Sequence, residues 1–417
     1  MRDAHDRVVI TGVGLVSPLG TGRAEAWSAA VAGRSGAGPI TQFDARDHGV
    51  KIACEARGFD PLDHLDRRTV RRMDRASQLA VTAARLALED AGLSVDGREE
   101  RIGTVISTGN GGNASFEQQH RTFLERGADR VSPVTVPMSI ANMAGGQVSI
   151  ELGLRGPMLS VLTACATGLH SIGEAMHMVR SGMADAVLAG GAEAAITPYA
   201  VAGLDASKAM SHRNDDPAGA SRPFDADRDG FVLGEAGAVL VLERLDQALA
   251  RGADVLCEVA GYGATSDAYH LTEPAPGGAE QAEALRVALR GAGLEPEQLD
   301  YVNAHATSTV AGDVAEIAGI VEALGPEVAA RTAVSATKSM HGHCVGATGA
   351  LETALTALTI AEGVIPPTIN LEALDEACAG VDHVANRARR ASVRAAACSG
   401  FGFGGHNAVL TLTAVEA

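Results

Sequence analysis

The sequence predicts an α/β protein whose mostly parallel sheet is covered by helices on both faces. Short apolar runs and amphipathic segments alternate along most of the 417 residues, and this order is typical of such sheets. No low-complexity linker divides the chain, so we expect one continuous body. The strand–turn–helix pattern around 164–168 recurs around 334–349, which indicates an internal duplication with halves at 1–253 and 254–417.

The individual elements follow from the periodicity of the apolar residues. Residues 7–14 predict a buried strand, and residues 69–91 predict one amphipathic helix that ends at Gly92. A polar stretch at 211–230 separates later elements. Further strands are expected at 101–108, 157–162, 187–191, 237–243, 255–261, 299–304 and 333–337, and further helices at 169–180, 278–292, 313–323 and 346–361.

The glycine turn after the first strand raises the question of a dinucleotide site. Gly12 and Gly14 match the first two positions of G-x-G-x-x-G, but Ser17 replaces the third glycine. Pro18 then follows where a phosphate-binding helix should be under way. A Rossmann-type cofactor site is therefore disfavoured.

Composition excludes several classes of protein. The net charge of −17 argues against a nucleic-acid partner, because phosphate binding needs a basic surface. No apolar stretch reaches the length of a membrane span, and the polar residues 1–7 argue against a signal peptide. The six cysteines form no C-x-x-C pair and fit a reduced, cytoplasmic interior; they are Cys54, Cys165, Cys257, Cys344, Cys378 and Cys398.

Cys165 stands between an apolar run and a predicted helix. A strand that ends in a tight turn before a helix directs the first helical amides at the side chain, and the helix dipole favours a thiolate. We therefore expect Cys165 to be a nucleophile at neutral pH. A small buried cysteine is the alternative that its local sequence leaves open.

Two histidines follow predicted strands in the second half of the chain. His305 comes directly after the strand at 299–304, and His343 lies between the strand at 333–337 and a helix. Because functional groups gather at the carboxyl ends of strands in open α/β sheets, these imidazoles and Cys165 are expected to meet.

One thiolate and two imidazoles suit acyl transfer followed by carbon–carbon bond formation. The thiolate takes an acyl group from a thioester, and neutral imidazole N–H groups hold the oxygen of an enolate formed by decarboxylation. A metal site at His341 and His343 lacks a matching acidic cluster, so no metal is expected. A serine-hydrolase-like elbow fails because Thr163 and Thr167 occupy the positions that require glycine.

Six longer motifs are spread along the chain: VITGVGLVSPLG at 9–20, SRPFD at 221–225, DGFVLGE at 229–235, HATST at 305–309, KSMHGH at 338–343 and GFGFGG at 400–405. With these motifs, the whole chain resembles the β-ketoacyl-acyl-carrier-protein synthases, condensing enzymes of the thiolase fold, and most of all their elongating type II class. The resemblance implies a duplicated five-layer αβαβα arrangement with mixed sheets.

The resemblance also implies a role for each matching residue. Cys165 would carry the acyl chain, His305 and His343 would support decarboxylation, and Lys338 would orient the site with Glu352 behind it. The backbone amides of Cys165 and Phe403 would form an oxyanion hole. Further supporting and substrate-binding positions are Phe401 and Phe403 as gate residues, Thr307 and Thr309 at the phosphopantetheine arm, Thr272 at the substrate, and Asn110 in the acyl pocket.

The partners that the resemblance implies are an acyl carrier protein and a second subunit. Substrates would arrive on the carrier's phosphopantetheine, with no cofactor bound by the enzyme itself. The second subunit would be an identical chain or a cysteine-less chain-length-factor homologue. Basic residues expected at the carrier-docking surface are Arg71, Arg72, Arg130 and Lys208, although Asp129 departs from the basic pattern.

Departures from the family pattern leave the pathway open. Asn110 replaces an apolar acyl-pocket residue, which hints at a polyketide or polyene substrate unless the amide is satisfied locally. His341 replaces a small hydroxyl residue. A coenzyme-A thiolase remains a remote alternative, because such enzymes need a second catalytic cysteine and Cys398 lies upstream of the expected place. The length-setting partner itself is disfavoured by the presence of Cys165.

Overall fold

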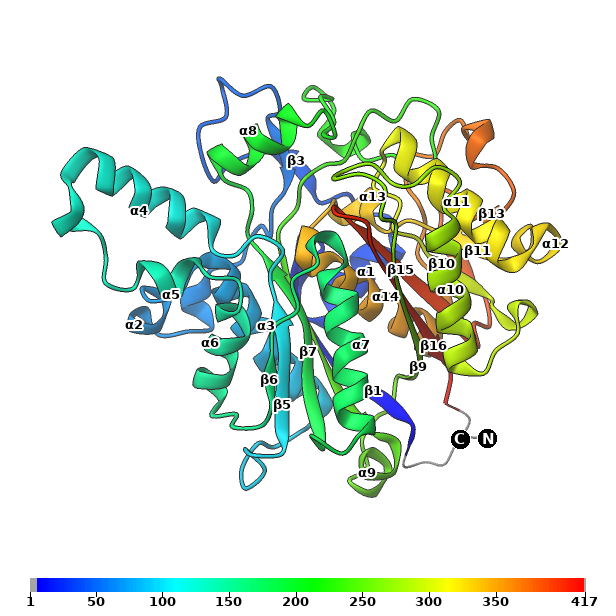
Figure 1. Ribbon diagram of the computed structural model, residues 1–417, viewed down its shortest axis with the longest axis horizontal. Coiled ribbons are helices and arrows are strands. Elements are labelled where there is room, and N and C mark those ends of the chain that lie inside the picture. Colours follow the sequence, from blue (N-terminus) through cyan, green and yellow to red (C-terminus); the bar gives the residue numbers. More distant parts are fainter. Residues whose placement is uncertain (1–5, 416–417) are drawn as a thin grey trace.

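A mixed β-sheet runs through the computed structural model, which describes residues 6–415 (Figure 1). Residues 1–5 and 416–417 lie outside the described part, and the signal-peptide expectation rests largely on the first of these segments. Within the described part, the main sheet has 12 strands in the order β13-β11-β10-β15-β16-β9-β1-β8-β7-β5-β6, with β2 beside β1.

Each half of this sheet repeats one pairing pattern. In the first half β1 pairs antiparallel with β8, β8 antiparallel with β7, and β7 runs parallel to β5, which is parallel to β6. The second half repeats this order, two antiparallel pairs followed by two parallel pairs, through β9, β16, β15, β10 and β11. The strands are β1 (Val8–Ser17), β5 (Ile102–Ser107), β6 (Met158–Leu159), β7 (Ala186–Glu193), β8 (Ala236–Arg244), β9 (Cys257–Ser266), β10 (Tyr301–Asn303), β11 (Ala333–Ser335), β15 (Ala395–Gly402) and β16 (His406–Thr413).

The centre of the sheet is antiparallel, so the expectation of a mostly parallel sheet is wrong. The two halves join where β1 and β9 pair antiparallel through Val9–Glu258 and Ile10–Cys257. Parallel pairs occur only toward the two ends of the sheet. The mixed sheets implied by the thiolase resemblance are confirmed.

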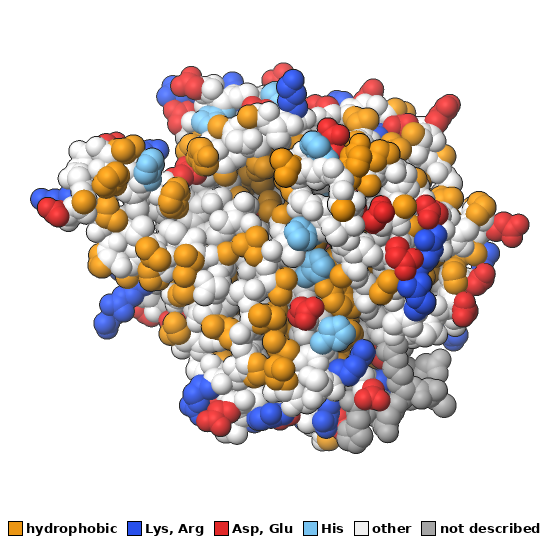
Figure 2. All heavy atoms as spheres, in the orientation of Figure 1, with side chains coloured by type: hydrophobic (Ala, Val, Ile, Leu, Met, Phe, Trp, Pro, Cys, Tyr) orange, Lys and Arg blue, Asp and Glu red, His pale blue; other side chains and the backbone are white. Residues whose placement is uncertain are grey.

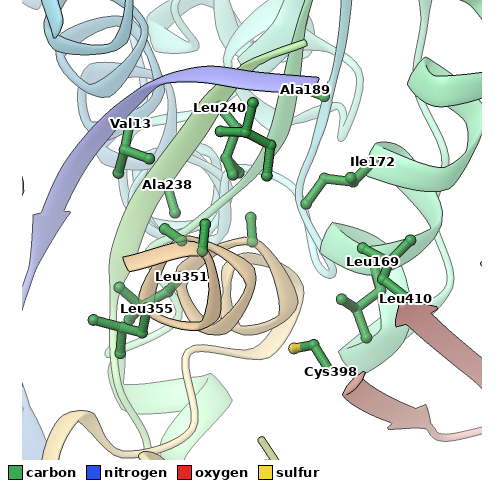
Figure 3. Packing of buried hydrophobic residues seen from close by; sticks show 14 of the residues in the cluster. Val13, Leu169, Ile172, Ala189, Ala238, Leu240, Leu351, Leu355, Cys398 and Leu410 are labelled. Carbon is green, nitrogen blue, oxygen red and sulfur yellow. The ribbon is translucent and has the colours of Figure 1, made fainter. Parts of the chain in front are cut away.

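Helices form three layers around the two halves of the sheet. In the middle, α7 (Thr167–Arg180) and α14 (Thr348–Glu362) lie side by side, and both are buried along most of their length. Figure 3 shows Leu169 and Leu351 from these helices facing apolar side chains of the surrounding strands. The outer layers are α3 (Arg75–Ala91) and α6 (Met143–Leu152) on the first half, and α10 (Ala279–Ala292) and α11 (Val310–Leu324) on the second. The predicted five-layer arrangement is confirmed.

Glycines bring the outer helices onto the central strands. A Cβ at Gly14 would lie 1.8 Å from the Ala83 carbonyl oxygen of α3, and one at Gly12 would lie 2.4 Å from that of Ala87. Strand β9 packs against α10 in the same way, because a Cβ at Gly263 would lie 2.0 Å from the Ala284 carbonyl oxygen. The glycine pair of β1 therefore serves helix packing, and β1 continues through it to Ser17.

Three sequence expectations differ from the structure. The helix expected at 69–91 is divided into α2 (Arg67–Val70) and α3, because the Asp74 carboxylate accepts the N–H groups of Ala76 and Ser115 and caps a new helix. The strand expected at 157–162 is only Met158–Leu159. The hairpin of β15 and β16 was not predicted, although it lies near the middle of the sheet.

The other predicted elements are present with boundaries shifted by a few residues. Among the described residues, no helix combines the length and apolar character that crossing a membrane requires. The remaining elements are β2 (Gly20–Thr21), α1 (Arg23–Val31), β3 (Ala37–Pro39), β4 (Ile52–Cys54), α4 (Asn113–Arg126), α5 (Thr135–Ser139), α8 (Pro198–Ala206), α9 (Leu245–Ala250), α12 (Pro326–Ala329), α13 (Lys338–His341), β12 (Val364–Ile365), β13 (Asp382–His383) and β14 (Arg389–Arg390).

The contact between β1 and α3 generates a stability prediction. Gly14→Ala forces a methyl group into the Ala83 carbonyl, so we expect it to lower the free energy of unfolding by about 2 kcal/mol or more. Gly203→Ala is the matched control, because nothing lies within 4 Å of its Cβ position in α8, and we expect it to be neutral or slightly stabilising. Urea unfolding followed by circular dichroism measures both variants, and equal stabilities would contradict this account.

Candidate active site

Cys165 lies in a short 3-10 turn, η4 (Ala164–Ala166), directly before α7. Ala164 has a φ of 50°, a left-handed backbone conformation that is uncommon for alanine. The turn η7 (Val345–Ala347) precedes α14 in the same way, and Val345 has a φ of 43°. The two turns lie against each other and position the nucleophile's loop beside the loop of His343.

The three candidate catalytic side chains meet in one cavity of about 420 Å³. His343 Nε2 lies 3.0 Å from the Cys165 sulfur, and its Nδ1 lies 3.2 Å from the Thr348 hydroxyl. The rings of His305 and His343 are nearly perpendicular, with centroids 5.5 Å apart. Residues from both halves of the chain therefore converge, as the strand-end argument predicted.

Burial controls the state of the Cys165 thiol. Burial raises the pKa of Cys165 to about 11, although the backbone amide of Phe403 and the charge of Lys338 oppose this shift. The prediction of a thiolate at neutral pH is therefore wrong, because the cost of burying a charge exceeds the effect of the helix end. Nε2 of His343 is placed to take the thiol proton when the sulfur reacts.

Both histidines are neutral at physiological pH. Burial, helped by the positive charge of Lys338, lowers the pKa of His305 and of His343 well below the usual value. A neutral imidazole keeps one N–H donor and one acceptor nitrogen. Nδ1 of His305 is buried without a hydrogen-bond partner, so the position of this ring depends on packing and on its backbone.

Lys338 is fully buried and paired with Glu352. Its Nζ lies 2.7 Å from both Glu352 oxygens, and neither side chain is more than 1% exposed. Each side chain needs the other, because removing either partner leaves an uncompensated buried charge. The positive end of this pair adds to the effect of burial, which is the main reason that the pKa values of His305 and His343 are low.

His341 lies beside this ion pair and is also fully buried. Its Nε2 is 3.1 Å from the Thr337 hydroxyl and 3.8 Å from a Glu352 oxygen, while Nδ1 has no hydrogen-bond partner. The side chain does not line the cavity. Within the described residues, no group of three or more His, Cys, Asp or Glu side chains is arranged to hold a metal ion.

The expected gate residues lie in the hairpin of β15 and β16. Phe401 packs its ring on that of His305, with centroids 5.6 Å apart. Phe403 sits in the turn of the hairpin, lines the cavity and is 38% exposed. The amides of Phe403 and Cys165 both interact with the Cys165 sulfur, which places them where the expected oxyanion hole requires donors.

The substrate-binding candidates all line the cavity. The hydroxyls of Thr307 and Thr309 lie 3.1 Å apart, and Thr272 lies on the opposite loop. Asn110 also lines the cavity, and its amide interacts with the buried Glu193 carboxylate. This local partner removes the physical reason to infer a polar substrate from Asn110.

The docking candidates are spread over several elements. Lys208 is exposed and lines the cavity, whereas Arg71, Arg72 and Arg130 are exposed but do not line it. Arg71 and Arg72 follow α2, Arg130 ends a turn after α4, and Lys208 follows α8. Of these four basic residues, Lys208 alone lines the cavity.

Two supporting residues were not predicted from the sequence. Glu316 of α11 accepts the backbone N–H groups of His305 and Ala306 at 2.7 and 2.6 Å, and so fixes the loop that carries His305. Phe231 packs edge-on against His343, with ring centroids 5.5 Å apart. Phe231 stands in one of the motifs that carry the resemblance, but Glu316 had no signal beyond a carboxylate on the buried face of a helix.

Known proteins share this fold and site over nearly the whole chain. The family described as Beta-ketoacyl synthase, N-terminal domain, matches residues 5–248, and its C-terminal domain matches residues 256–372. A 3-oxoacyl-(acyl-carrier-protein) synthase 2 from Synechocystis is 47% identical, covering 97% of both chains. One from Staphylococcus aureus is also 47% identical, covering 99% of both.

Solved structures agree with these relatives. The ishigamide ketosynthase/chain length factor has a TM-score of 0.92 and 39% identity, covering 99% of this chain and 100% of that one. A type II polyketide ketosynthase, solved with its acyl-carrier protein and bound to the hexaketide, has a TM-score of 0.90 and 30% identity with the same coverage.

The fold and the site define a condensing acyltransferase of the thiolase fold. The matched domains cover most of the chain, and the two relatives named above are 47% identical over nearly the whole length. The chain belongs to the β-ketoacyl synthase family.

Burial of His341 generates a pH prediction. Burial, with the Lys338 charge, lowers the pKa of His341 to about 3, whereas an unfolded histidine titrates near pH ~6.5. Between these values the unfolded chain binds more protons, so this imidazole reduces stability as the pH falls below about 6.5. When the pH is lowered from about 7.5 to about 5.5, the unfolding free energy of the wild type should fall. We expect that of His341→Ser to fall by about 1 kcal/mol less.

Urea unfolding at the two pH values measures this difference. His120→Ser is the control, because His120 is exposed, and we expect it to leave the pH dependence of stability unchanged. Equal pH dependence in His341→Ser and the wild type would show that His341 does not contribute.

Proposed function

We propose that this protein is a β-ketoacyl-acyl-carrier-protein synthase that extends an acyl chain on Cys165 by two carbons taken from malonyl-acyl-carrier protein. The observation that carries the proposal is the convergence of Cys165, His343 and His305 in one cavity, with Nε2 of His343 3.0 Å from the sulfur. The curated relatives named 3-oxoacyl-(acyl-carrier-protein) synthase 2 support the same chemistry.

In the first half-reaction the Cys165 sulfur attacks the thioester of the acyl-carrier protein. A carbon–sulfur bond forms at Cys165, the carrier's carbon–sulfur bond breaks, and the thiol proton passes through His343 Nε2 to the departing carrier sulfur. The amides of Cys165 and Phe403 hold the oxyanion of the tetrahedral intermediate. Thr307 and Thr309 accept the phosphopantetheine arm, and Thr272 and Asn110 line the space around it.

In the second half-reaction the malonyl thioester loses CO₂, and the electrons of the broken carbon–carbon bond form an enolate. The N–H of His305 holds its oxygen, and His343 donates to it in the tautomer that carries the proton on Nε2, with Nδ1 accepting from the Thr348 hydroxyl. The enolate carbon attacks the acyl carbonyl, the bond to Cys165 breaks, and the released thiolate takes a proton from solvent. The charge of Lys338, which is paired with Glu352, adds to burial in keeping both imidazoles neutral. Phe401 and Phe403 act as a gate between the acyl chain and the catalytic side chains.

The proposal predicts an acyl adduct on Cys165. After incubation with acyl-acyl-carrier protein, intact-mass analysis should show one acyl group on the wild type and none on Cys165→Ala. His305→Ala should still acquire the acyl group, because the hydrogen bond to the sulfur comes from His343, but should release CO₂ from malonyl-carrier at least ~100-fold more slowly. An adduct that persists in Cys165→Ala would reject the proposal.

The same assay tests carrier docking. We propose that Arg71, Arg72, Arg130 and Lys208 attract the carrier to a protein whose overall charge is negative. Lys208→Glu should slow acylation by the carrier-bound substrate but leave acylation by the same acyl group on free pantetheine unchanged. An equal loss with both substrates would mean that Lys208 acts on the cavity and not on the carrier.

The second candidate function is a polyketide or polyene ketosynthase that works with a cysteine-less chain-length factor. The likeness to the ishigamide ketosynthase/chain length factor favours it. The thiolase alternative has no such support, because Cys398 is fully buried in β15 and does not line the cavity. The cytoplasm is the proposed compartment, supported by six cysteines that are all free thiols, and cell fractionation tests it.

An apolar face is proposed as the site of the second subunit. Strand β6 ends the sheet, and its residues Met158 and Leu159 are 51% and 40% exposed. Figure 2 shows further hydrophobic side chains on this face, over α4, α5 and the region of β6 and α7. Sheet edges and large apolar patches favour association with another chain. We propose that a chain of the same fold covers this face.

Light scattering on the purified chain tests this proposal. We expect a particle of twice 42.5 kDa, and we expect Leu159→Arg to convert it to a monomer. Leu249→Arg is the matched control, because Leu249 is 59% exposed and belongs to α9, which packs on β1 and β8. A monomer that dimerises only with a cysteine-less homologue would support the second candidate. A dimer unaffected by Leu159→Arg would place the interface elsewhere.

A further inference from the structure

Glu193 is a buried carboxylate next to the active site to which the proposed chemistry assigns no role. It is the last residue of β7 and is 0% exposed. Its Oε2 accepts the backbone N–H of Gly109 at 2.7 Å and that of Gly346 at 3.1 Å. Gly109 belongs to the loop after β5, and Gly346 belongs to η7, the turn after His343. One carboxylate therefore ties together two loops of the cavity wall.

These two loops are in direct backbone contact around the carboxylate. A Cβ at Gly346 would lie 2.3 Å from the Gly109 nitrogen, and a Cβ at Gly109 would lie 2.8 Å from Glu193 Oε2. Neither loop can move toward the other, and the shared acceptor opposes their separation. Gly109 and Val345, from the same two loops, line the cavity together with Cys165.

The charge of Glu193 acts on the nucleophile. Burial raises the pKa of Glu193 to about 7, although the two glycine amides oppose this shift, and the negative charge of Asp74 adds to it. An ionised Glu193 in turn raises the pKa of the Cys165 thiol, whereas the Lys338 charge lowers it. The Asn110 amide also interacts with the carboxylate, and Oε1 has no partner within normal hydrogen-bond distance.

We propose that Glu193 is a positioning residue of the acyl-transfer site, which fixes the loop after β5 against the turn after His343 and whose charge, buried in the same cavity wall, acts on the reactivity of the Cys165 sulfur. The inference rests on the proposed function only in taking Cys165 as the nucleophile. A neutral thiol is a poor target for oxidants and alkylating agents, so a charge that disfavours the thiolate also slows these reactions at the sulfur. The charged and titratable groups that influence the balance between thiol and thiolate at Cys165 are Glu193, Asp74, Lys338 and His343.

The test is the rate at which iodoacetamide alkylates Cys165, followed by intact mass. Glu193→Gln keeps the size and an acceptor oxygen but removes the charge, so we expect alkylation at about pH 8 to be about twofold faster or more. Glu55→Gln is the matched control, because Glu55 is also buried and accepts two backbone amides, those of Thr41 and Gln42, but does not line the cavity. We expect its alkylation rate to equal that of the wild type. An unchanged rate in Glu193→Gln would overturn the proposal.

The wild type gives a second readout that does not depend on a variant's folding. If Glu193 controls the thiol, the logarithm of the alkylation rate should rise less steeply with pH around pH ~7, where Glu193 ionises and disfavours the thiolate. A slope of one throughout would contradict the coupling. Alkylation needs no substrate, so its outcome is independent of whether acyl-carrier protein acylates Cys165.

Discussion

The contact between the first turns of α7 and α14 is the constraint on which the site depends. A Cβ at Gly168 would lie 2.6 Å from the Ala350 nitrogen, and one at Gly349 would lie 2.9 Å from the Leu169 nitrogen. The two helices therefore meet backbone to backbone at their N-terminal ends. Because Cys165 precedes one helix and His343 precedes the other, this single contact brings a thiol and an imidazole from distant parts of the chain within 3.0 Å.

Burial gives the groups around this contact their chemical states. The interior disfavours charge, so the thiol keeps its proton and the imidazoles remain neutral. Lys338 can remain charged there because both oxygens of Glu352 neutralise it. The outcome is a site with one fixed cation, neutral hydrogen-bonding groups, and a sulfur that reacts only when its proton can move. Such a site stabilises an enolate oxygen without a strong base.

Much of the fold and most of the site could be predicted from the sequence. Strands and helices with regular apolar spacing were placed within a few residues, and the rule that functional groups gather at strand ends brought Cys165, His305 and His343 together correctly. The direction of the central strands was not predictable, because β1 is buried on both faces, as is β9 over residues 257–261, and these segments carry no alternation to indicate their pairing.

The errors have physical causes that a linear sequence does not show. The break before α3 depends on Asp74 bonding to Ser115, which is 41 residues away. The state of Cys165 depends on burial by segments from both halves, whereas only the neighbouring helix was visible beforehand. His341 and Glu193 matter through neighbours that only the fold supplies.

The place of β16 in the sheet has a consequence for how this protein is made. β16 lies between β9 and β15, and β15 lies beside β10. Residues 395–413 therefore link strands whose last residues, Ser266 and Asn303, precede Ala395 by 129 and 92 residues. Until that hairpin is synthesised, β9 and β10 have open edges and the apolar side chains around α14 lack part of their cover. A nascent chain in this state exposes unpaired strands and is a natural client for chaperones.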